Sequence, residues 1–244
     1  MKKTAILTVE GLMLLGLLAG GGILVAQKKA KPWTEWSLKE AEKLLEDSAW
    51  AQTQVMSDMS EMFYLPGRGT GEVATQRDAR GALNQTTALN LHIRFLSAKP
   101  VRQAFARVMQ LQQENINDRL SQGLRDFVDR RFDDIIVVAV TYDSKDRRFS
   151  GPAMQAFGSA TIGSLKNKTY LELKDGTRQF LVDYQVPIND GLGAKFIFNR
   201  IVDGRPFITP ETGEVRFYCE LSKEITLNMR YKVRDFLYGG VLEF

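Results

Sequence analysis

The sequence predicts an α+β fold: an N-terminal signal segment and amphipathic helix, one or two further helices, then a mainly antiparallel β-sandwich or open barrel. Three patterns carry this prediction. They are a capped helix motif at 37–46, apolar residues at helical spacing between 100 and 131, and alternating apolar and polar residues after 157. Short alternating strands with a turn about every 8–12 residues are typical of antiparallel sandwiches and barrels.

Four segments follow from these patterns. We expect a signal peptide at 1–26, a basic leader with the N-terminal helical segment at 27–65, and a glycine-rich loop at 66–87. Residues 88–244 are expected to form a single β-rich domain with a helical insertion at about 100–131.

The first 26 residues have the pattern of a secretory signal. Lys2 and Lys3 form a charged start, and the apolar run from Gly11 to Ala26 is shorter than the ~20 residues of a membrane span. Cleavage fits after Ala26 or near Ala19. We therefore expect export to the periplasm or the extracellular space, with no stable membrane span after cleavage. The alternative is an anchor that remains uncleaved.

The following helix has a clear start signal. Ser37 and Glu40 form a capping box, and Trp36 precedes it where it can pack against Ala41. All three tryptophans lie between Trp33 and Trp50. We interpret them as core anchors, because large aromatic residues are mostly buried; the alternative is an aromatic platform for a sugar or a partner.

This opening also resembles a known family. Pro32-Trp33-Thr34-Glu35, followed by Trp36-Ser37, is similar to the start of bacterial exported proteins named after a Gly-Trp-x-Thr-Asp motif, although the Gly and the Asp are missing here. The stretches 93–104 and 232–244 are similar as well. The resemblance implies an export route and a β-rich fold, and it carries over no site residues.

The glycine-rich loop supplies the candidate partner-binding residues. It lacks the Gly-Lys-Ser/Thr of a P-loop and the spacing of a dinucleotide fingerprint, so no nucleotide cofactor is indicated. Arg68, Arg77 and Arg80 would offer forked donors to carboxylates or phosphates of a partner. The alternative is a connector without a partner.

The middle of the chain mixes helix and strand. Residues 51–63 fit either a helical turn or a first strand, and 89–95 alternate clearly as a strand with His92 on the polar face. Helical spacing begins at Pro100, with possible breaks at 112–117 and at Gly123. An apolar strand at 134–142 is expected to be central. As the only histidine, His92 is interpreted as a surface strand residue.

The sequence of the C-terminal half predicts strands joined by turns. Asp175-Gly176 predicts a hairpin turn between 170–174 and 179–184, and further strands are expected at 195–202, 215–221 and 225–233. Cys219 alternates with polar neighbours, so it is expected to be a buried, inert thiol. The adjacent Asp133 and Asp134 would point to opposite faces of a strand, which argues against a catalytic pair.

Function is constrained mainly by what the sequence lacks. The net charge of +4 is spread over interleaved acidic and basic residues, which is not a nucleic-acid-binding pattern. We find no nucleophile motif, metal cluster or cofactor fingerprint, so we predict no catalytic, metal or cofactor residues. The leading hypothesis is an exported, non-enzymatic binding or structural module that contacts an envelope protein or polymer. One alternative is a carboxylate-dependent hydrolase whose site converges only in the fold, and another is an anchored assembly component.

Overall fold

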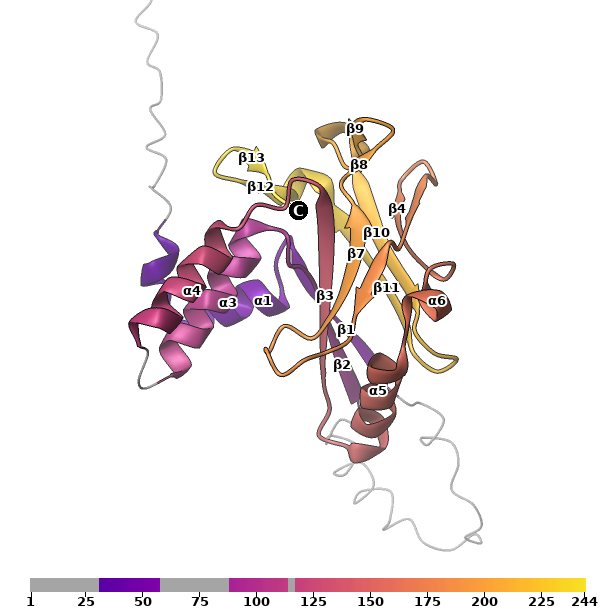
Figure 1. Ribbon diagram of the computed structural model, residues 1–244, viewed down its shortest axis with the longest axis horizontal. Coiled ribbons are helices and arrows are strands. Elements are labelled where there is room, and N and C mark those ends of the chain that lie inside the picture. Colours follow the sequence, from indigo (N-terminus) through magenta and orange to yellow (C-terminus); the bar gives the residue numbers. More distant parts are fainter. Residues whose placement is uncertain (1–30, 58–87, 114–116) are drawn as a thin grey trace, which may run out of the picture. The chain divides into compact units, whose positions relative to one another are not determined.

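Two antiparallel sheets pack face to face, and helices cover the outer side of one of them (Figure 1). The computed structural model describes residues 31–57, 88–113 and 117–244. Residues Pro32–Phe244 form one compact unit, so the N-terminal helix shares a core with the C-terminal strands.

The larger sheet has five strands in the order β1-β2-β3-β7-β6. Their bounds are Ala51–Ser57 for β1, Ala88–Phe95 for β2, Ile135–Asp143 for β3, Ala194–Asn199 for β7 and Asp183–Gln185 for β6. The central strand β3 is buried on both faces, as its continuous apolar sequence predicts.

The smaller sheet has four strands in the order β11-β10-β4-β5. Their bounds are Thr226–Lys232 for β11, Glu214–Glu220 for β10, Thr169–Leu173 for β4 and Arg178–Phe180 for β5. Two short hairpins complete the strands: β8 (Ile201–Val202) with β9 (Arg205–Pro206), and β12 (Leu237–Tyr238) with β13 (Val241–Leu242).

Aromatic side chains join the two sheets. Phe217 of β10 lies 5.4 Å from Phe196 and 6.3 Å from Phe198 of β7, measured between ring centroids. The Tyr231 hydroxyl of β11 donates to the Ile93 carbonyl of β2 at 2.9 Å. The region 179–184, predicted as one strand, is instead split. β5 pairs with the smaller sheet and β6 with the larger one, because Leu181 N–H bonds to Thr169 O and Val182 N–H to Ile197 O.

Five α-helices are present in the described residues: α1 (Leu38–Glu46), α3 (Lys99–Gln112), α4 (Asp118–Asp129), α5 (Arg147–Ser159) and α6 (Ile162–Leu165). Short 3₁₀ turns occur at Trp33–Glu35, Pro210–Thr212 and Val233–Phe236. The break predicted at 112–117 separates α3 from α4. Helix α5 was not predicted, and it contains Pro152 within its span.

The N-terminal motif is confirmed in detail. Ser37 Oγ accepts from the Glu40 N–H at 3.3 Å, and the Ser37 N–H donates to the Glu40 carboxylate at 2.6 Å. Trp36 packs against the core that contains the fully buried Ala41, and Trp50 is buried with its indole N–H bonded to the Glu243 carbonyl at 2.7 Å. The tryptophan-rich stretch therefore anchors α1 to the core at both ends.

Candidate functional site

The outward side of the four-stranded sheet carries a dense set of polar and aromatic side chains, which we call the polar sheet face. Period-two alternation creates it. The inward positions of β10 are Val215, Phe217 and Cys219, all fully buried, so the residues between them point outward. Helices α1, α3 and α4 lie against the other sheet (Figure 1), which leaves this face open to solvent. Its members are Tyr170, Glu172, Arg178, Phe180, Glu214, Arg216, Tyr218, Glu220, Asn228, Arg230 and Lys232, with Lys168 at its border.

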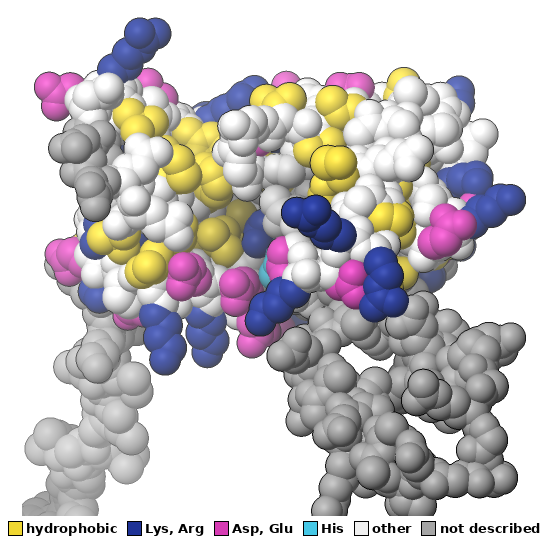
Figure 2. Space-filling model, turned by 90° about the horizontal axis from the view of Figure 1, so that it is seen from below, with side chains coloured by type: hydrophobic (Ala, Val, Ile, Leu, Met, Phe, Trp, Pro, Cys, Tyr) yellow, Lys and Arg dark blue, Asp and Glu magenta, His cyan; other side chains and the backbone are white. Residues whose placement is uncertain are grey.

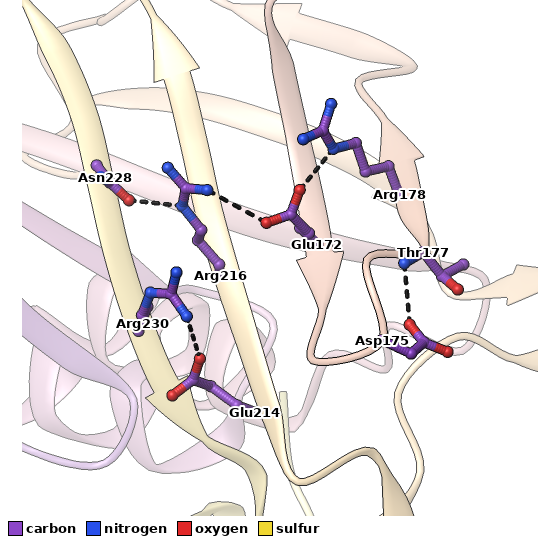
Figure 3. A network of polar contacts seen from close by, with 8 residues as sticks. All are labelled: Glu172, Asp175, Thr177, Arg178, Glu214, Arg216, Asn228 and Arg230. Carbon is purple, nitrogen blue, oxygen red and sulfur yellow. Dashed lines mark hydrogen bonds and ion pairs between the residues drawn. The ribbon is translucent and has the colours of Figure 1, made fainter.

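A chain of polar contacts crosses all four strands (Figure 3). Glu172 of β4 accepts from Arg178 Nε of β5 at 2.5 Å and from Arg216 Nη1 of β10 at 3.2 Å. Arg216 Nε then donates to Asn228 Oδ1 of β11 at 2.7 Å. Beside this chain, Arg230 Nη1 donates to Glu214 Oε1 at 2.7 Å. The side chains are thus held in place before any partner arrives.

The strand register explains this network. Glu172 lies directly opposite both Arg178 and Arg216, and directly opposed opposite charges stabilise neighbouring strands. The hydrogen bond from Arg178, together with a second from Arg216, lowers the pKa of Glu172 although desolvation by burial acts in the opposite direction. Glu172 is therefore ionised at neutral pH.

Aromatic rings of the polar sheet face lie against the guanidinium groups of two of its arginines. Tyr170 and Tyr218 stack with their centroids 5.0 Å apart. The guanidinium of Arg178 lies 4.3 Å from the Tyr170 ring centroid, and that of Arg216 lies 5.1 Å from the Tyr218 centroid. Such cation–π contacts restrict the arginine side chains, which lowers the entropy that binding would cost.

The charge balance of the face is positive. Its cations are Lys168, Arg178, Arg216, Arg230 and Lys232, and its carboxylates are Glu172, Glu214 and Glu220. Each carboxylate is already paired with a cation, Glu220 with Lys168 at 2.6 Å. The resulting net charge of +2 and the exposed arginine donors are suited to anionic groups, which arginine binds through two parallel hydrogen bonds.

The same pairing makes the face a poor acid–base site. A glycosidase-type site needs one carboxyl group with a raised pKa to act as the acid. Glu172 shows the opposite shift, because its arginine partners favour the ionised form. Within the described ranges, no group of three or more His, Cys, Asp or Glu side chains is placed to hold a metal ion.

One polar cluster, around His92, was not predicted from the sequence. His92 was expected to be a simple surface residue, but its side chain is only 15% exposed and both ring nitrogens have partners. Nε2 lies 2.7 Å from Asp143 Oδ2, and Nδ1 lies 2.9 Å from Thr53 Oγ1, whose hydroxyl is 3.2 Å from the Glu46 carbonyl. The only signal was the polar Thr141-Tyr142-Asp143 ending of a strand, and the sequence does not say which strand lies beside it.

This Asp–His–Thr order resembles a catalytic triad, but its hydrogen bonds favour a structural role. The Thr53 hydroxyl points its proton at the Glu46 carbonyl rather than at a substrate. Arg94, on the same face, donates to Leu45 O at 2.6 Å and to Thr141 Oγ1 at 2.7 Å. The cluster therefore ties the end of α1 to β1, β2 and β3.

The residues singled out in the sequence have mixed outcomes. Arg68, Arg77 and Arg80 lie outside the described residues, so their role stays a prediction. Asp133 pairs with Arg131 at 3.0 Å on the surface. Cys219 is fully buried on the inner face of β10, as predicted, and burial raises the pKa of its thiol to about 12.

The surface beyond this site has mixed charge. Figure 2 shows basic and acidic side chains lying next to one another along the lower edge of the face seen from below, and hydrophobic side chains gathered above them. In the part of the chain that the structure describes, no helix has both the length and the apolar character needed to cross a membrane.

Comparison with known proteins adds no assignment. No protein-family model, no curated protein and no solved structure matches this chain.

Proposed function

We propose that this chain is an exported, non-enzymatic protein of the bacterial cell envelope that binds an anionic polymer through the polar sheet face. The observation that carries the proposal is the pre-arranged row of arginines, on a sheet face whose side chains have an excess of positive charge. The charged and apolar pattern of residues 1–26 supports export, as does the resemblance to exported proteins with the Gly-Trp-x-Thr-Asp motif.

The geometry of the face suits an extended polymer. Neighbouring strands lie about 4.8 Å apart, so a row across four strands spans roughly 15 Å, which is long enough for several repeating units of a chain. A row of side chains that are already held in place across the strands can contact such a chain along its length (Figure 3). The excess positive charge selects carboxylate or phosphate groups.

Hydrolysis is the weaker alternative. A carboxylate-dependent hydrolase would need a carboxyl group that can donate a proton near neutral pH. The carboxylates of this face are paired with Arg178, Arg230 and Lys168 instead, and the arginine partners of Glu172 lower its pKa. We therefore favour binding over catalysis.

Co-sedimentation with isolated envelopes of the source bacterium tests the binding surface. Arg178→Glu and Arg230→Glu should each reduce binding of the purified mature protein, and added salt should weaken binding of the parent. Arg125→Glu on α4 is the matched control, because Arg125 is an arginine that bonds to the neighbouring Gln122 and lies on another element.

Two results would overturn the proposal. Equal sedimentation of the parent and both sheet-face variants would remove the polar sheet face as the binding surface. Loss of binding after protease treatment of the envelopes would make the partner a protein rather than a polymer.

Export has its own test. N-terminal sequencing of the protein from the envelope fraction should give a start at Gln27, following cleavage after Ala26. An intact Met1 in that fraction would favour the anchored alternative.

A further inference from the structure

A second cationic site lies at the end of the larger sheet where β3 begins and β7 ends, in a cavity of about 370 Å³. Four segments line it: the start of α3, the α4–β3 connection, Arg200 after β7, and the end of β13. None of these segments contributes to the polar sheet face. The cavity opens to solvent at its rim, where the Arg131 side chain is 83% exposed. We call it the arginine cavity.

The charges of the arginine cavity do not balance. Its lining includes the five cations Lys99, Arg102, Arg130, Arg131 and Arg200, and the three carboxylates Asp129, Asp133 and Glu243. Asp129 pairs with Lys99 at 3.3 Å and Asp133 with Arg131 at 3.0 Å, while Glu243 accepts from the Lys99 backbone N–H at 2.9 Å. Among the described residues, Arg102 and Arg130 therefore have no side-chain carboxylate at ion-pair distance, and Arg200 contacts the main-chain oxygen of Phe244.

Arg102 places a positive charge in the wall of the cavity. It is only 4% exposed, and its guanidinium donates to backbone carbonyls, among them Arg130 O at 2.9 Å, Val128 O at 3.3 Å and Ser97 O. Carbonyls supply partial charge but no full negative charge. Burial lowers the pKa of Arg102 to about 10, which reflects the cost of holding this cation in the interior.

Arg200 supplies an unused donor. Its Nη2 donates to the Phe244 backbone oxygen and its guanidinium lies 4.0 Å from the Phe244 ring centroid. Its Nε, however, is buried and has no hydrogen-bond partner among the described residues. Buried donors are nearly always paired in folded proteins, so an unpaired Nε on a residue that lines the cavity is a donor for which an acceptor is expected.

Arg130 completes the site from the open side. Its guanidinium lies 5.2 Å from the Phe132 ring centroid, and the guanidinium of Arg102 lies 4.9 Å from the same centroid. The ring thus holds one buried and one exposed guanidinium next to a single cavity. Forked guanidinium donors match the oxygens of a phosphate group, and two net positive charges match a dianion better than a monoanionic carboxylate.

We propose that the arginine cavity binds a phosphate group, held by Arg130 and Arg200 and stabilised by the buried charge of Arg102. The cavity lies near the lower end of the volumes typical of ligand pockets, so the ligand is a small phosphate or the phosphate end of a longer molecule. The arginine cavity is separate from the polar sheet face. The phosphate proposal therefore holds even if the polar sheet face binds no polymer.

Calorimetric titration of the purified chain with inorganic phosphate, at constant ionic strength maintained with chloride, tests this proposal. We expect one saturable site in the parent. Arg130→Gln should weaken phosphate affinity roughly tenfold or more, because a charged hydrogen bond is lost. Arg125→Gln, which removes an exposed arginine of α4 outside the cavity, should bind as the parent does.

Arg130→Gln is the decisive variant. Its side chain is exposed, so its loss leaves the core intact, whereas Arg200 also packs on Phe244. Absence of saturable binding in the parent, or equal affinity in Arg130→Gln and the parent, would overturn the site. Tighter binding of acetate than of phosphate in a parallel titration would overturn the assignment to phosphate. Tighter binding of glycerol phosphate than of inorganic phosphate would support the end of a longer molecule as the natural ligand.

Discussion

The side-chain amide of Gln54 bonds to the backbone of Asn228 and so joins the free edges of the two sheets. Gln54 Oε1 accepts from the Asn228 N–H at 2.8 Å, and Gln54 Nε2 donates to the Thr226 carbonyl at 2.7 Å. Gln52 makes a third contact, to the Arg230 carbonyl at 3.2 Å. These amides occupy backbone groups of β11 that would otherwise form an open sheet edge, which is a site where proteins aggregate.

Gln54→Ala should lower the free energy of unfolding by about 1–2 kcal/mol, because two hydrogen bonds of ordinary strength are lost. Gln52→Ala, which removes one longer contact, is the matched control and should cost less than about 1 kcal/mol. Urea denaturation of both variants measures the difference. Equal midpoints for Gln54→Ala and the parent would mean that the amide bridge does not stabilise the fold.

Ser37→Ala should lower the free energy of unfolding by about 1 kcal/mol, the usual cost of removing an N-cap. The hydroxyl accepts from the Glu40 N–H, so its loss leaves a helix donor of α1 without that partner. Thermal or urea denaturation can detect this change. Ser121→Ala, a substitution inside α4 rather than at a cap, serves as the control, and an equal loss there would argue against a specific capping effect.

Cys219 should resist thiol reagents under native conditions. The side chain is fully buried, its Sγ accepts from the Thr169 hydroxyl at 3.2 Å, and burial keeps the thiol protonated at neutral pH by raising its pKa to about 12. Labelling should become rapid only when denaturant unfolds the chain. Fast labelling of the native protein would show that β10 opens locally.

Much of the fold could be predicted from the sequence, because many of its helices, strands and turns have recognisable local sequence patterns. The alternation at Val215, Phe217 and Cys219 identified β10, and Asp175-Gly176 identified the turn between β4 and β5, where Gly176 has a φ of +88°. Helix α5 was missed because Pro152 and two glycines make its sequence a poor helix former. Its burial of Ala153 and Phe157 in the core outweighs that weak propensity.

The candidate sites were harder to predict from the sequence, because they depend on pairing between segments that are far apart in the chain. Glu172 and Arg216 are 44 residues apart and become neighbours only through the β4–β10 register. Arg102 and Arg200 line one cavity although they lie on α3 and after β7. Sequence periodicity shows which face of a strand is polar, but it does not show which strand lies beside it.

Asp143→Asn should destabilise the protein near neutral pH and lose this effect in acid. Desolvation by burial acts to raise the pKa of Asp143, but hydrogen bonds from His92 and Asn90 outweigh it and lower the pKa below its usual 3.8. A lowered folded-state pKa means that the unfolded chain binds the proton more readily. The carboxylate therefore stabilises the fold above about pH 4, and this contribution disappears as pH falls through the folded-state pKa.

The difference in unfolding free energy between the parent and Asp143→Asn should consequently be fully present above about pH 5 and shrink toward pH 2. It should stay below about 1 kcal/mol, because the Asp143 side chain is 59% exposed and water screens the interaction. In a His92→Asn background the same substitution should have a smaller effect, since the 2.7 Å contact is already lost. A difference in unfolding free energy that stays constant from pH 5 to pH 2 would show that the His92–Asp143 pair contributes no charge-dependent stability. A difference that is equally large in the His92→Asn background would show the same.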